Sequence, residues 1–434
     1  MTEKYRAYTL KNFRDIPQIQ HLSEEQIFDI EVVGQVFPFK TNNYVVDQLI
    51  DWNNVPNDPS FVLTFPQRGM LRPHHYKEIA AVMKSGADER TIRETADRIR
   101  WQLNPHPAGQ IEHNVPTLWG QRLEGMQHKY KETVLFFPNR GQTCHAFCSF
   151  CFRWPQFVGI NELKFGMKEV EPLIHYVQQH PGITDILFTG GDPLVMSTKV
   201  IEDYIVPVLN ADIRHLKSIR LGTKSLSYWP QRFTSDEDAD ELLELFRKVV
   251  RSGKHLAVMA HFNHPGELYT ETVREAIRRI RETGAEIRTQ TPLLHHINDD
   301  PRDIAEMWQE QVNLGCIPYY LFIVRNTGAQ HYFGVPLVRA WEIFRDAYGE
   351  VSGLSRTVRG PSMSARPGKV QVLGVNEIFG RKVMVLNMLQ GRDPDWVMRP
   401  FFAEYDEDAM WLDELKPAFG AEKFFFEEEF LPVG

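Results

Sequence analysis

From about residue 133 onward, short apolar runs alternate with amphipathic helical patterns, and this alternation constrains the fold more than any other feature. Strands are predicted at 133–138, 185–189, 217–221, 255–260, 286–290 and 319–324, and helices at 166–179, 199–209, 237–252, 270–283, 302–314 and 337–348. Successive strand–helix units require parallel strands joined by right-handed crossovers. Six units without a sign of doubling predict an α/β fold, a partial (β/α)6 barrel.

The chain is predicted to have three parts: a mostly helical N-terminal region over 1–127, the barrel over 128–350 and a C-terminal extension over 351–434. In the first part, Ser23-Glu24-Glu25-Gln26 is a capping-box pattern that predicts a short helix. A polar helix is predicted over 86–103, and the proline-bounded stretch from Pro105 to Pro116 is predicted to be a linker.

Three of the four cysteines, Cys144, Cys148 and Cys151, lie in one loop with the spacing C-x₃-C-x₂-C. Thiolates this close can ligate one iron–sulfur cluster, and three of them leave the fourth iron of a [4Fe–4S] cluster open for another ligand. A zinc site would need a fourth ligand, and His145 is poorly placed for it directly after Cys144. Zinc and unrelated buried cysteines remain the alternatives. Cys316, in an apolar stretch, is predicted to be a small buried residue.

Polar residues follow the predicted strands, at the end of a barrel where functional residues collect. A barrel without a site would not need a polar group after each strand, so we expect the active site at this end. After the cysteine loop these groups are Gly190-Gly191-Asp192-Pro193, Gly222-Thr223-Lys224, His261-Phe262-Asn263-His264, Gln290 and Arg325-Asn326.

Several of these residues allow both a functional and a plain structural interpretation. The glycines of Gly190–Pro193 let the backbone approach a ligand, or form an ordinary turn. Arg153 is predicted to clamp a substrate carboxylate, or to compensate the charge of a cluster. His261 and His264 are predicted to hydrogen-bond around a cofactor, or to be satisfied buried histidines. Lys369 is predicted either to form a Schiff base with a cofactor or to be an ordinary surface lysine.

The composition narrows the classes of partner. The 434 residues carry a net charge of −8, which gives no support to nucleic-acid binding. No apolar run reaches the ~18 residues of a membrane span, and the N-terminus shows no signal-peptide pattern. Clustered cysteines in such a chain fit a reducing cytoplasm.

The cysteine loop followed by Gly190–Pro193 resembles the radical S-adenosylmethionine (SAM) enzymes, and the chain is similar to the lysine 2,3-aminomutase family within them. The resemblance implies a [4Fe–4S] cluster, SAM, pyridoxal phosphate (PLP), an amino acid substrate and an electron donor such as flavodoxin or ferredoxin. The implied reaction is a 1,2-amino shift started by a 5′-deoxyadenosyl radical. The matching stretches are Asn57-Asp58-Pro59, His128-Lys129-Tyr130, Cys144 through Arg153, Gly190–Pro193, Ile219–Gly222, Pro230-Gln231-Arg232, His261–Pro265, Pro318-Tyr319-Tyr320 and Gly368-Lys369.

The resemblance also implies roles for individual residues. The family's PLP-bearing lysine falls on Lys369, the pair that holds PLP and its phosphate on Lys129 and Tyr130, and the arginine for the substrate carboxylate on Arg153. The expected cluster ligands are Cys144, Cys148 and Cys151. The remaining cofactor-binding residues are expected to be Gly190, Gly191, Asp192, Pro193, Thr223 and Gln290.

The chain departs from the family at several of these positions. Arg325 and Ser362 fall where the lysine enzymes have aspartates for the distal ammonium of lysine. A buried arginine repels an ammonium and pairs with a carboxylate, so Arg325 is predicted to bind an acidic amino acid, glutamate first. A phosphate-binding arginine of the family falls on Thr133, and Arg366 could replace its contact. The zinc-binding cysteines of some members are absent, so the aromatic tail must pack by other means, for which a second subunit of a homo-oligomer is one option.

The sequence therefore predicts a PLP-dependent radical SAM 2,3-aminomutase acting on a non-lysine amino acid. The alternatives are a radical SAM enzyme without PLP that acts on a different substrate, a lysine 2,3-aminomutase with an altered pocket, and a non-catalytic iron–sulfur protein.

Overall fold

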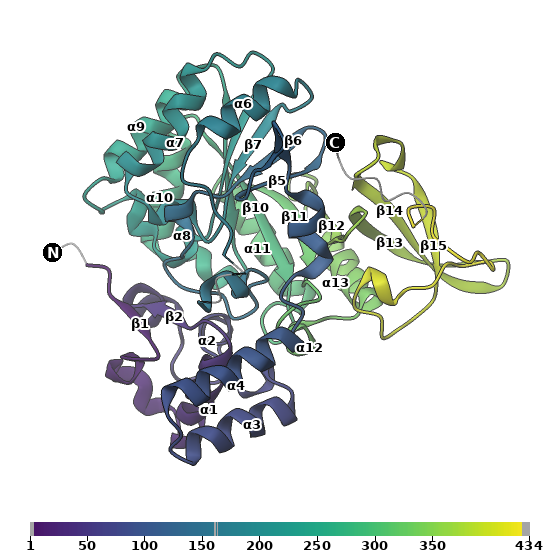
Figure 1. Ribbon diagram of the computed structural model, residues 1–434. Coiled ribbons are helices and arrows are strands. Elements are labelled where there is room, and N and C mark those ends of the chain that lie inside the picture. The colour runs from purple at the N-terminus through teal and green to yellow at the C-terminus, as the bar shows by residue number, and fades with distance from the viewer. Residues whose placement is uncertain (1–3, 160–161, 163, 428–434) are drawn as a thin grey trace.

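The structure, a computed structural model, describes residues 4–159, 162 and 164–427. One mixed sheet of eleven strands forms its centre (Figure 1). Its strands are β5 (Met126–Tyr130), β6 (Thr133–Phe136), β7 (Asp185–Phe188), β8 (Ser218–Thr223), β9 (His255–His261), β10 (Glu286–Leu293), β11 (Ile317–Ile323), β12 (Arg359–Ser364), β13 (Gly368–Ile378), β14 (Arg381–Gly391) and β15 (Pro400–Glu404).

Strands β6 to β12 are parallel, and each is joined to the next by a crossover that contains a helix. The predicted partial barrel of six strand–helix units is therefore confirmed, and β12 adds a seventh parallel strand that the sequence did not predict. The helices after β6 are α6 (Glu171–Gln179), α7 (Thr198–Asn210), α8 (Ser225–Tyr228), α9 (Ala239–Arg251), α10 (Glu271–Arg281), α11 (Pro301–Asn313), α12 (Gln330–Phe333) and α13 (Leu337–Glu350).

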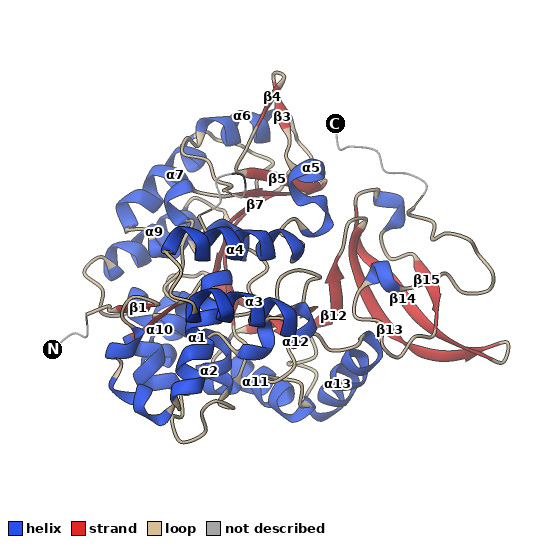
Figure 2. Ribbon diagram, turned by 60° about the horizontal axis from the view of Figure 1, so that its bottom comes forward, coloured by secondary structure: helices blue, strands red, loops and turns tan. Residues whose placement is uncertain are grey.

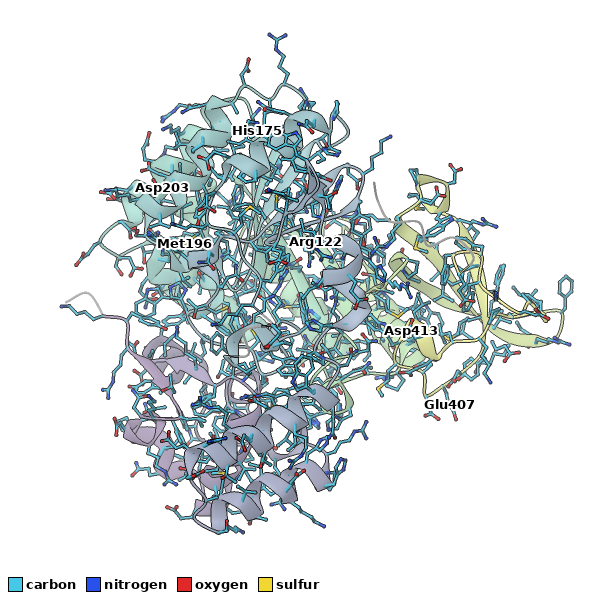
Figure 3. The ribbon with its side chains drawn as sticks, in the orientation of Figure 1. Arg122, His175, Met196, Asp203, Glu407 and Asp413 are labelled. Atoms are coloured by element: carbon cyan, nitrogen blue, oxygen red, sulfur yellow. The ribbon has the colours of Figure 1, made fainter. Side chains whose placement is uncertain are left out.

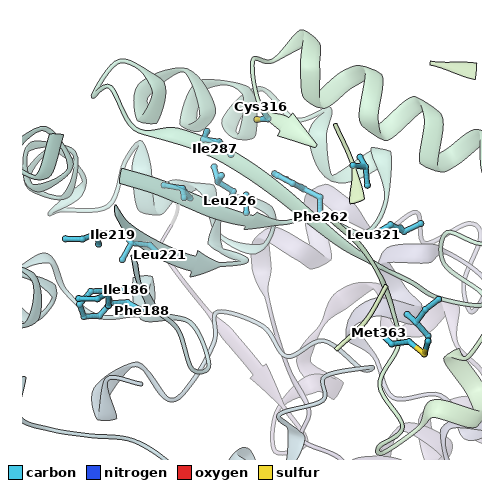
Figure 4. Close-up of a cluster of buried hydrophobic side chains, with 14 of the residues drawn as sticks. Ile186, Phe188, Ile219, Leu221, Leu226, Phe262, Ile287, Cys316, Leu321 and Met363 are labelled. Carbon is cyan, nitrogen blue, oxygen red and sulfur yellow. The ribbon is translucent and has the colours of Figure 1, made fainter. Parts of the chain in front are cut away.

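The parallel strands are buried on the face that meets the crossover helices, and their apolar side chains form the core. Figure 4 shows Ile186, Phe188 and Leu221 among these residues, and Cys316 lies with them at 3% exposure. The prediction that Cys316 is a small buried residue is confirmed. Figure 3 shows Asp203 of α7 at the outer layer of helices, where the polar side chains meet solvent.

The N-terminal region consists of short helices beside the barrel (Figure 2). Ser23 and Gln26 form the predicted capping box at the start of α1, through bonds of 3.2 and 2.8 Å. The elements of this region are β1 (Ala7–Thr9), α1 (Glu24–Val36), β2 (Lys40–Asn42), α2 (Pro59–Thr64), α3 (Pro73–Lys84), α4 (Glu89–Gln102), α5 (Gln110–Asn114), β3 (Thr117–Leu118) and β4 (Gln121–Arg122). No described helix is both long and apolar enough to cross a membrane.

Two details of this region differ from the prediction. The helix expected over 86–103 begins later, because Gly86 has φ +71° and Asp88 caps α4 by accepting from the backbone of Thr91 at 2.8 Å. The stretch expected to be a linker contains α5, and Arg392 of the C-terminal part donates to the carbonyl of His113 at 3.3 Å.

The C-terminal strands β13 to β15 extend the barrel sheet with antiparallel pairing. Phe424 and Phe426 of the tail pack on Phe401 of β15, with ring centroids 5.4 and 5.5 Å apart. The described tail is thus held within its own chain, and residues 428–434 lie outside the described part. The division of the chain after 127 and 350 stays a prediction.

Candidate active site

A cavity of about 670 Å³ is lined by residues from all three parts of the chain. Most of the predicted site residues line it, among them Lys129, Tyr130, Cys144, Cys148, Cys151, Arg153, Gly190, Gly191, Asp192, Thr223, Gln290, Arg325 and Lys369. Residues far apart in the sequence thus meet in one space, as the strand-end pattern predicts. Pro193 begins a short 3₁₀ turn and is buried next to the cavity wall.

The N-terminal region holds the cysteine loop in place by hydrogen bonds. The Lys40 ammonium donates to the carbonyl of Cys144 at 2.7 Å, and the Asn42 amide donates to the carbonyl of His145 at 3.2 Å. Further along the loop, the Ser149 backbone donates to the carbonyl of Leu63 at 2.9 Å. The loop therefore depends on contacts from residues more than 80 positions away.

Each of the three thiols has one cation near it. Burial raises the pKa of Cys144, Cys148 and Cys151, and the charges of Lys40, Lys224 and Arg153, respectively, oppose this rise. Within the described ranges, no three His, Cys, Asp or Glu side chains surround a single metal ion. A four-iron cluster spreads its thiolates over different irons, so the three thiols need not converge on one point. Three thiols at one cavity, each with a compensating cation, fit a cluster.

The glycine motif packs directly under the cysteine loop. A Cβ atom on Gly191 would collide with the backbone of Thr143, and Gly190 has φ +147°. The Asp192 carboxylate accepts from the backbone of Leu194 and Lys224 and from the hydroxyls of Thr223 and Ser225, at 2.8–3.0 Å. The Asp192 and Thr223 side chains therefore bond to one another, whereas no hydrogen bond within the described part involves the Gln290 side chain.

His261 and His264, which follow the fourth predicted strand, have different surroundings. His261 lines the cavity, and burial lowers its pKa well below the usual range, which favours the neutral ring. The His264 ring does not line the cavity and accepts from the backbone of Gly266 at 3.2 Å. Their roles stay predictions.

Lys369 lies on β13, between Ser364 of β12 and Gln390 of β14. Its ammonium lies 3.9 Å from the centre of the Tyr320 ring. Burial, followed by the charges of Arg359 and Arg220, lowers the pKa of Lys369 well below its usual range. An unprotonated amine is the form that forms an imine with a carbonyl compound, so Lys369 suits the attachment of PLP.

Lys129 and Tyr130 are neighbouring polar residues on the wall of the cavity that Lys369 also lines. The Tyr130 hydroxyl is buried without a hydrogen bond, although Ser364 is near, and burial raises its pKa to about 12. Lys129 donates to the carbonyl of Ala365, and burial and Arg392 lower its pKa well below the usual range. An unpaired hydroxyl beside cations is what a phosphate group would satisfy, so these residues fit PLP.

Arg153 and Arg325 lie against the same ring, that of Phe152. Their guanidinium carbons are 5.0 and 4.6 Å from its centre. Burial lowers the pKa of each arginine to about 10, and the charge of Arg325 also lowers the pKa of Arg153. Arg325 donates to the carbonyl of Ser364 at 3.0 Å, and one of its nitrogens is buried without a partner. Neither forms an ion pair with a carboxylate of the described residues, so the pair can bind an anionic ligand.

The other departures from the resembled family lie mostly outside the pocket. Ser362 is fully buried and does not line the cavity. Thr133 lines it, and its hydroxyl donates to Asp185 at 3.0 Å. Arg366 is exposed and is not among the lining residues, whereas Arg392 is near enough to affect Lys129 and Tyr130.

Sequence reasoning missed three features of the site. Phe152, which contacts both arginines, belongs to the cysteine loop, but its apolar side chain gives no indication of a role in the site. Arg220 donates to Asp185 at 2.9 Å on the cavity wall, a pair that only the neighbouring strands β7 and β8 reveal. Tyr228, after β8, is directed at the cysteine loop, and no pattern in its surroundings predicts this.

Comparisons with known proteins place these features in context. No family model matches the chain. A curated protein of Aquifex aeolicus, named "Putative L-lysine 2,3-aminomutase", is 30% identical over 407 residues, which cover 93% of this chain and 95% of that protein. The L-lysine 2,3-aminomutase of Clostridium subterminale is 28% identical over 231 residues, 53% of this chain and 52% of that one. A crystal structure of SuiB of Streptococcus suis bound to the precursor peptide SuiA is 12% identical, with a TM-score of 0.35, and covers 63% of this chain and 57% of SuiB.

Proposed function

Because the chain belongs to the lysine 2,3-aminomutase family of radical SAM enzymes, we propose that it moves an amino group between Cα and Cβ of an acidic amino acid with the help of PLP. The observation that carries the substrate class is the pair of half-buried, cavity-lining arginines, Arg153 and Arg325, without carboxylate partners in the described part of the chain. Glutamate, with two carboxylates, is the first candidate.

The three cysteines would hold the cluster, and the backbone at Gly190 and Gly191 would approach SAM. Lys369 would attach PLP, with Lys129 and Tyr130 at its phosphate. When bound, these groups supply a 5′-deoxyadenosyl radical and the delocalisation of an unpaired electron. The electron would come from a donor such as flavodoxin or ferredoxin.

The protein's own contribution to this chemistry is positioning and charge. Arg153 and Arg325 bind carboxylates in a buried space, where charge-assisted hydrogen bonds are strong. Burial lowers the pKa of Lys369 and so favours the unprotonated amine, which is the form that reacts with a carbonyl group. The N-terminal region holds the cysteine loop in place through hydrogen bonds to Cys144 and Ser149.

A radical SAM enzyme without PLP is the second candidate. Thr133 stands where the family has a phosphate-binding arginine, and its hydroxyl is bonded to Asp185. Arg366 does not line the cavity and so does not replace the missing contact there. A PLP imine absorption band in the reconstituted protein selects the first candidate, and its absence selects the second.

The test is an anaerobic assay of the reconstituted protein with reductant, SAM and PLP. Glutamate, aspartate, lysine, arginine and alanine are offered in turn, and 5′-deoxyadenosine and β-amino acids are followed by mass spectrometry. We expect a β-amino acid from an acidic substrate alone. A β-amino acid from lysine would overturn the substrate class, and deoxyadenosine without any β-amino acid would leave the aminomutase assignment unsupported.

Two pairs of variants assign the residues. Lys369→Ala should abolish the β-amino acid, whereas Lys382→Ala, at an exposed lysine of β14, should not. Arg325→Met should lower kcat/KM for the acidic substrate on the order of 100-fold, the size of a lost charged hydrogen bond. Arg288→Met also alters the cavity wall, but Arg288 already pairs with Glu286 at 2.9 Å, so we expect a smaller effect.

A further inference from the structure

The Tyr228 hydroxyl points at the sulfur of one of the three loop cysteines. Tyr228 is the last residue of α8, and its Oη lies 3.6 Å from the Sγ of Cys148. Its side chain is 2% exposed, and this is the only hydrogen bond of the hydroxyl within the described ranges. The contact therefore joins the strand-end segment after β8 to the cysteine loop.

Tyr228 is held in place through its backbone and through a cation beside its ring. The Tyr228 carbonyl accepts from Asn42 at 2.9 Å, and the Tyr228 backbone nitrogen donates to the carbonyl of Lys224 at 2.9 Å. The Lys224 ammonium lies 4.4 Å from the ring centre and is itself paired with buried Glu267 at 2.7 Å. The hydroxyl is thus positioned by the protein and does not depend on a ligand for its orientation.

In this contact the Tyr228 hydroxyl is the donor and the sulfur of Cys148 is the acceptor. A donor to a cluster sulfur stabilises negative charge, and the reduced cluster carries one negative charge more than the oxidised cluster. Hydrogen bonds to the sulfurs are among the factors that set the reduction potential of such clusters.

We propose that Tyr228 is a positioning residue that, through the sulfur of Cys148, raises the reduction potential of the cluster and so makes its one-electron reduction easier. The inference rests on the cluster that the family implies and does not depend on PLP or on the amino acid substrate. It can therefore fail while the proposed function holds, and the reverse is also true.

The experiment measures the potential and not turnover. The reconstituted full chain is poised anaerobically at a series of potentials, and the EPR signal of the reduced cluster is recorded for the wild type and for Tyr228→Phe. We expect the midpoint of Tyr228→Phe to shift to a more negative potential at unchanged iron content. Tyr176→Phe is the matched control, because Tyr176 is also buried and its hydroxyl bonds to His128 at 2.7 Å, away from the cysteine loop. Its midpoint should equal that of the wild type.

Equal midpoints for Tyr228→Phe and the wild type, with intact clusters, would overturn the proposal. If Tyr228→Phe does not retain iron, replacement of Tyr228 by 3-fluorotyrosine keeps the hydroxyl and makes it a stronger donor. The midpoint should then shift to a more positive potential, and a shift in the other direction, or none, would overturn the proposal.

Discussion

The amine of Lys369 lies in surroundings that disfavour its protonated, positively charged form. Its ammonium has aromatic neighbours but no carboxylate partner in the described part, and burial lowers its pKa well below 10.5. Between the folded-state pKa and 10.5, the unfolded chain binds one proton more than the folded chain. The stability of the wild type therefore rises with pH through that interval, by up to about 1.4 kcal/mol per pH unit.

Lys369→Met removes this dependence, and the variant should be more stable than the wild type near neutral pH. Its advantage should shrink as the pH rises toward 10.5, where the unfolded lysine also loses its proton. Urea unfolding of the cofactor-free protein between pH 6 and 10 checks this. Lys382→Met, at an exposed lysine, should show no such trend, and an advantage that grew with pH would contradict the buried-amine interpretation.

The residues that would meet in one cavity could be predicted where chemistry and spacing signal them. The three cysteines, Arg153 and Lys369 were all found in the sequence, and all line one cavity. Ser362, which falls where the resembled family has an aspartate, does not line the cavity, and its buried hydroxyl donates to the carbonyl of Leu321 at 3.4 Å. Tyr228 could not be found, since its contact with Cys148 spans 80 positions and carries no pattern.

The elements that hold the cysteine loop come from the N-terminal region. Asn42 of β2 is fully buried, donates to the carbonyls of His145 and Tyr228, and accepts from the backbone of Val45 at 3.0 Å. It thus ties the cysteine loop to α8 and to the helical turn Val45–Leu49 that follows its own strand. Removal of its side chain takes away the bonds to the Tyr228 carbonyl and the Val45 backbone nitrogen, whereas the His145 carbonyl still accepts from the Tyr5 hydroxyl at 2.7 Å.

We expect Asn42→Ala to lower the stability by about 3 kcal/mol and to speed the loss of iron from the reconstituted protein. Asn298→Ala is a closely matched control, since Asn298 is 1% exposed, donates to the carbonyls of Asn263 and Pro292, and accepts from Leu294. Thermal unfolding and the rate of iron release to a chelator measure both effects. Equal rates of iron release from the two variants would show that the hydrogen bonds of Asn42 do not protect the cluster.

Helices and strands with a regular hydrophobic pattern were predicted closely, whereas those without one were not. The strands and helices from 133 to 350 differ from the prediction by a few residues at their ends. The strand β12 was missed because Arg359-Gly360-Pro361 reads as a turn, and it is held as a strand by its neighbours β11 and β13. Here the tertiary pairing prevails over the local pattern.

On the scale of the whole molecule, charge is distributed unevenly. The chain carries a net charge of −8, yet four basic side chains line its cavity, Lys129, Arg153, Arg325 and Lys369, and the two arginines have no ion-pair partner among the described carboxylates. The overall charge predicted that nucleic acid is not a partner, but it could not reveal this local excess. An anionic ligand bound there would interact with several parts of the chain at once.

We therefore expect PLP to stabilise segments from more than one part of the chain. Hydrogen exchange of the cofactor-free protein should slow on addition of PLP in β5 around Lys129, in β11 near Arg325 and in β13 around Lys369. Helix α9, on the outer layer, serves as the internal control and should not change. Protection confined to a single segment would contradict a cavity shared between the parts.

The strands of the large sheet lie side by side in the same order as in the chain, from β5 to β15. During synthesis on the ribosome, each new strand can therefore join the growing edge, and none has to be inserted between two strands already paired. The cysteine loop emerges early in this sequence, and Lys369, on the ninth strand of the eleven, emerges late. A nascent chain thus completes the wall of the cavity that carries the three cysteines well before the lysine of the same cavity has been made.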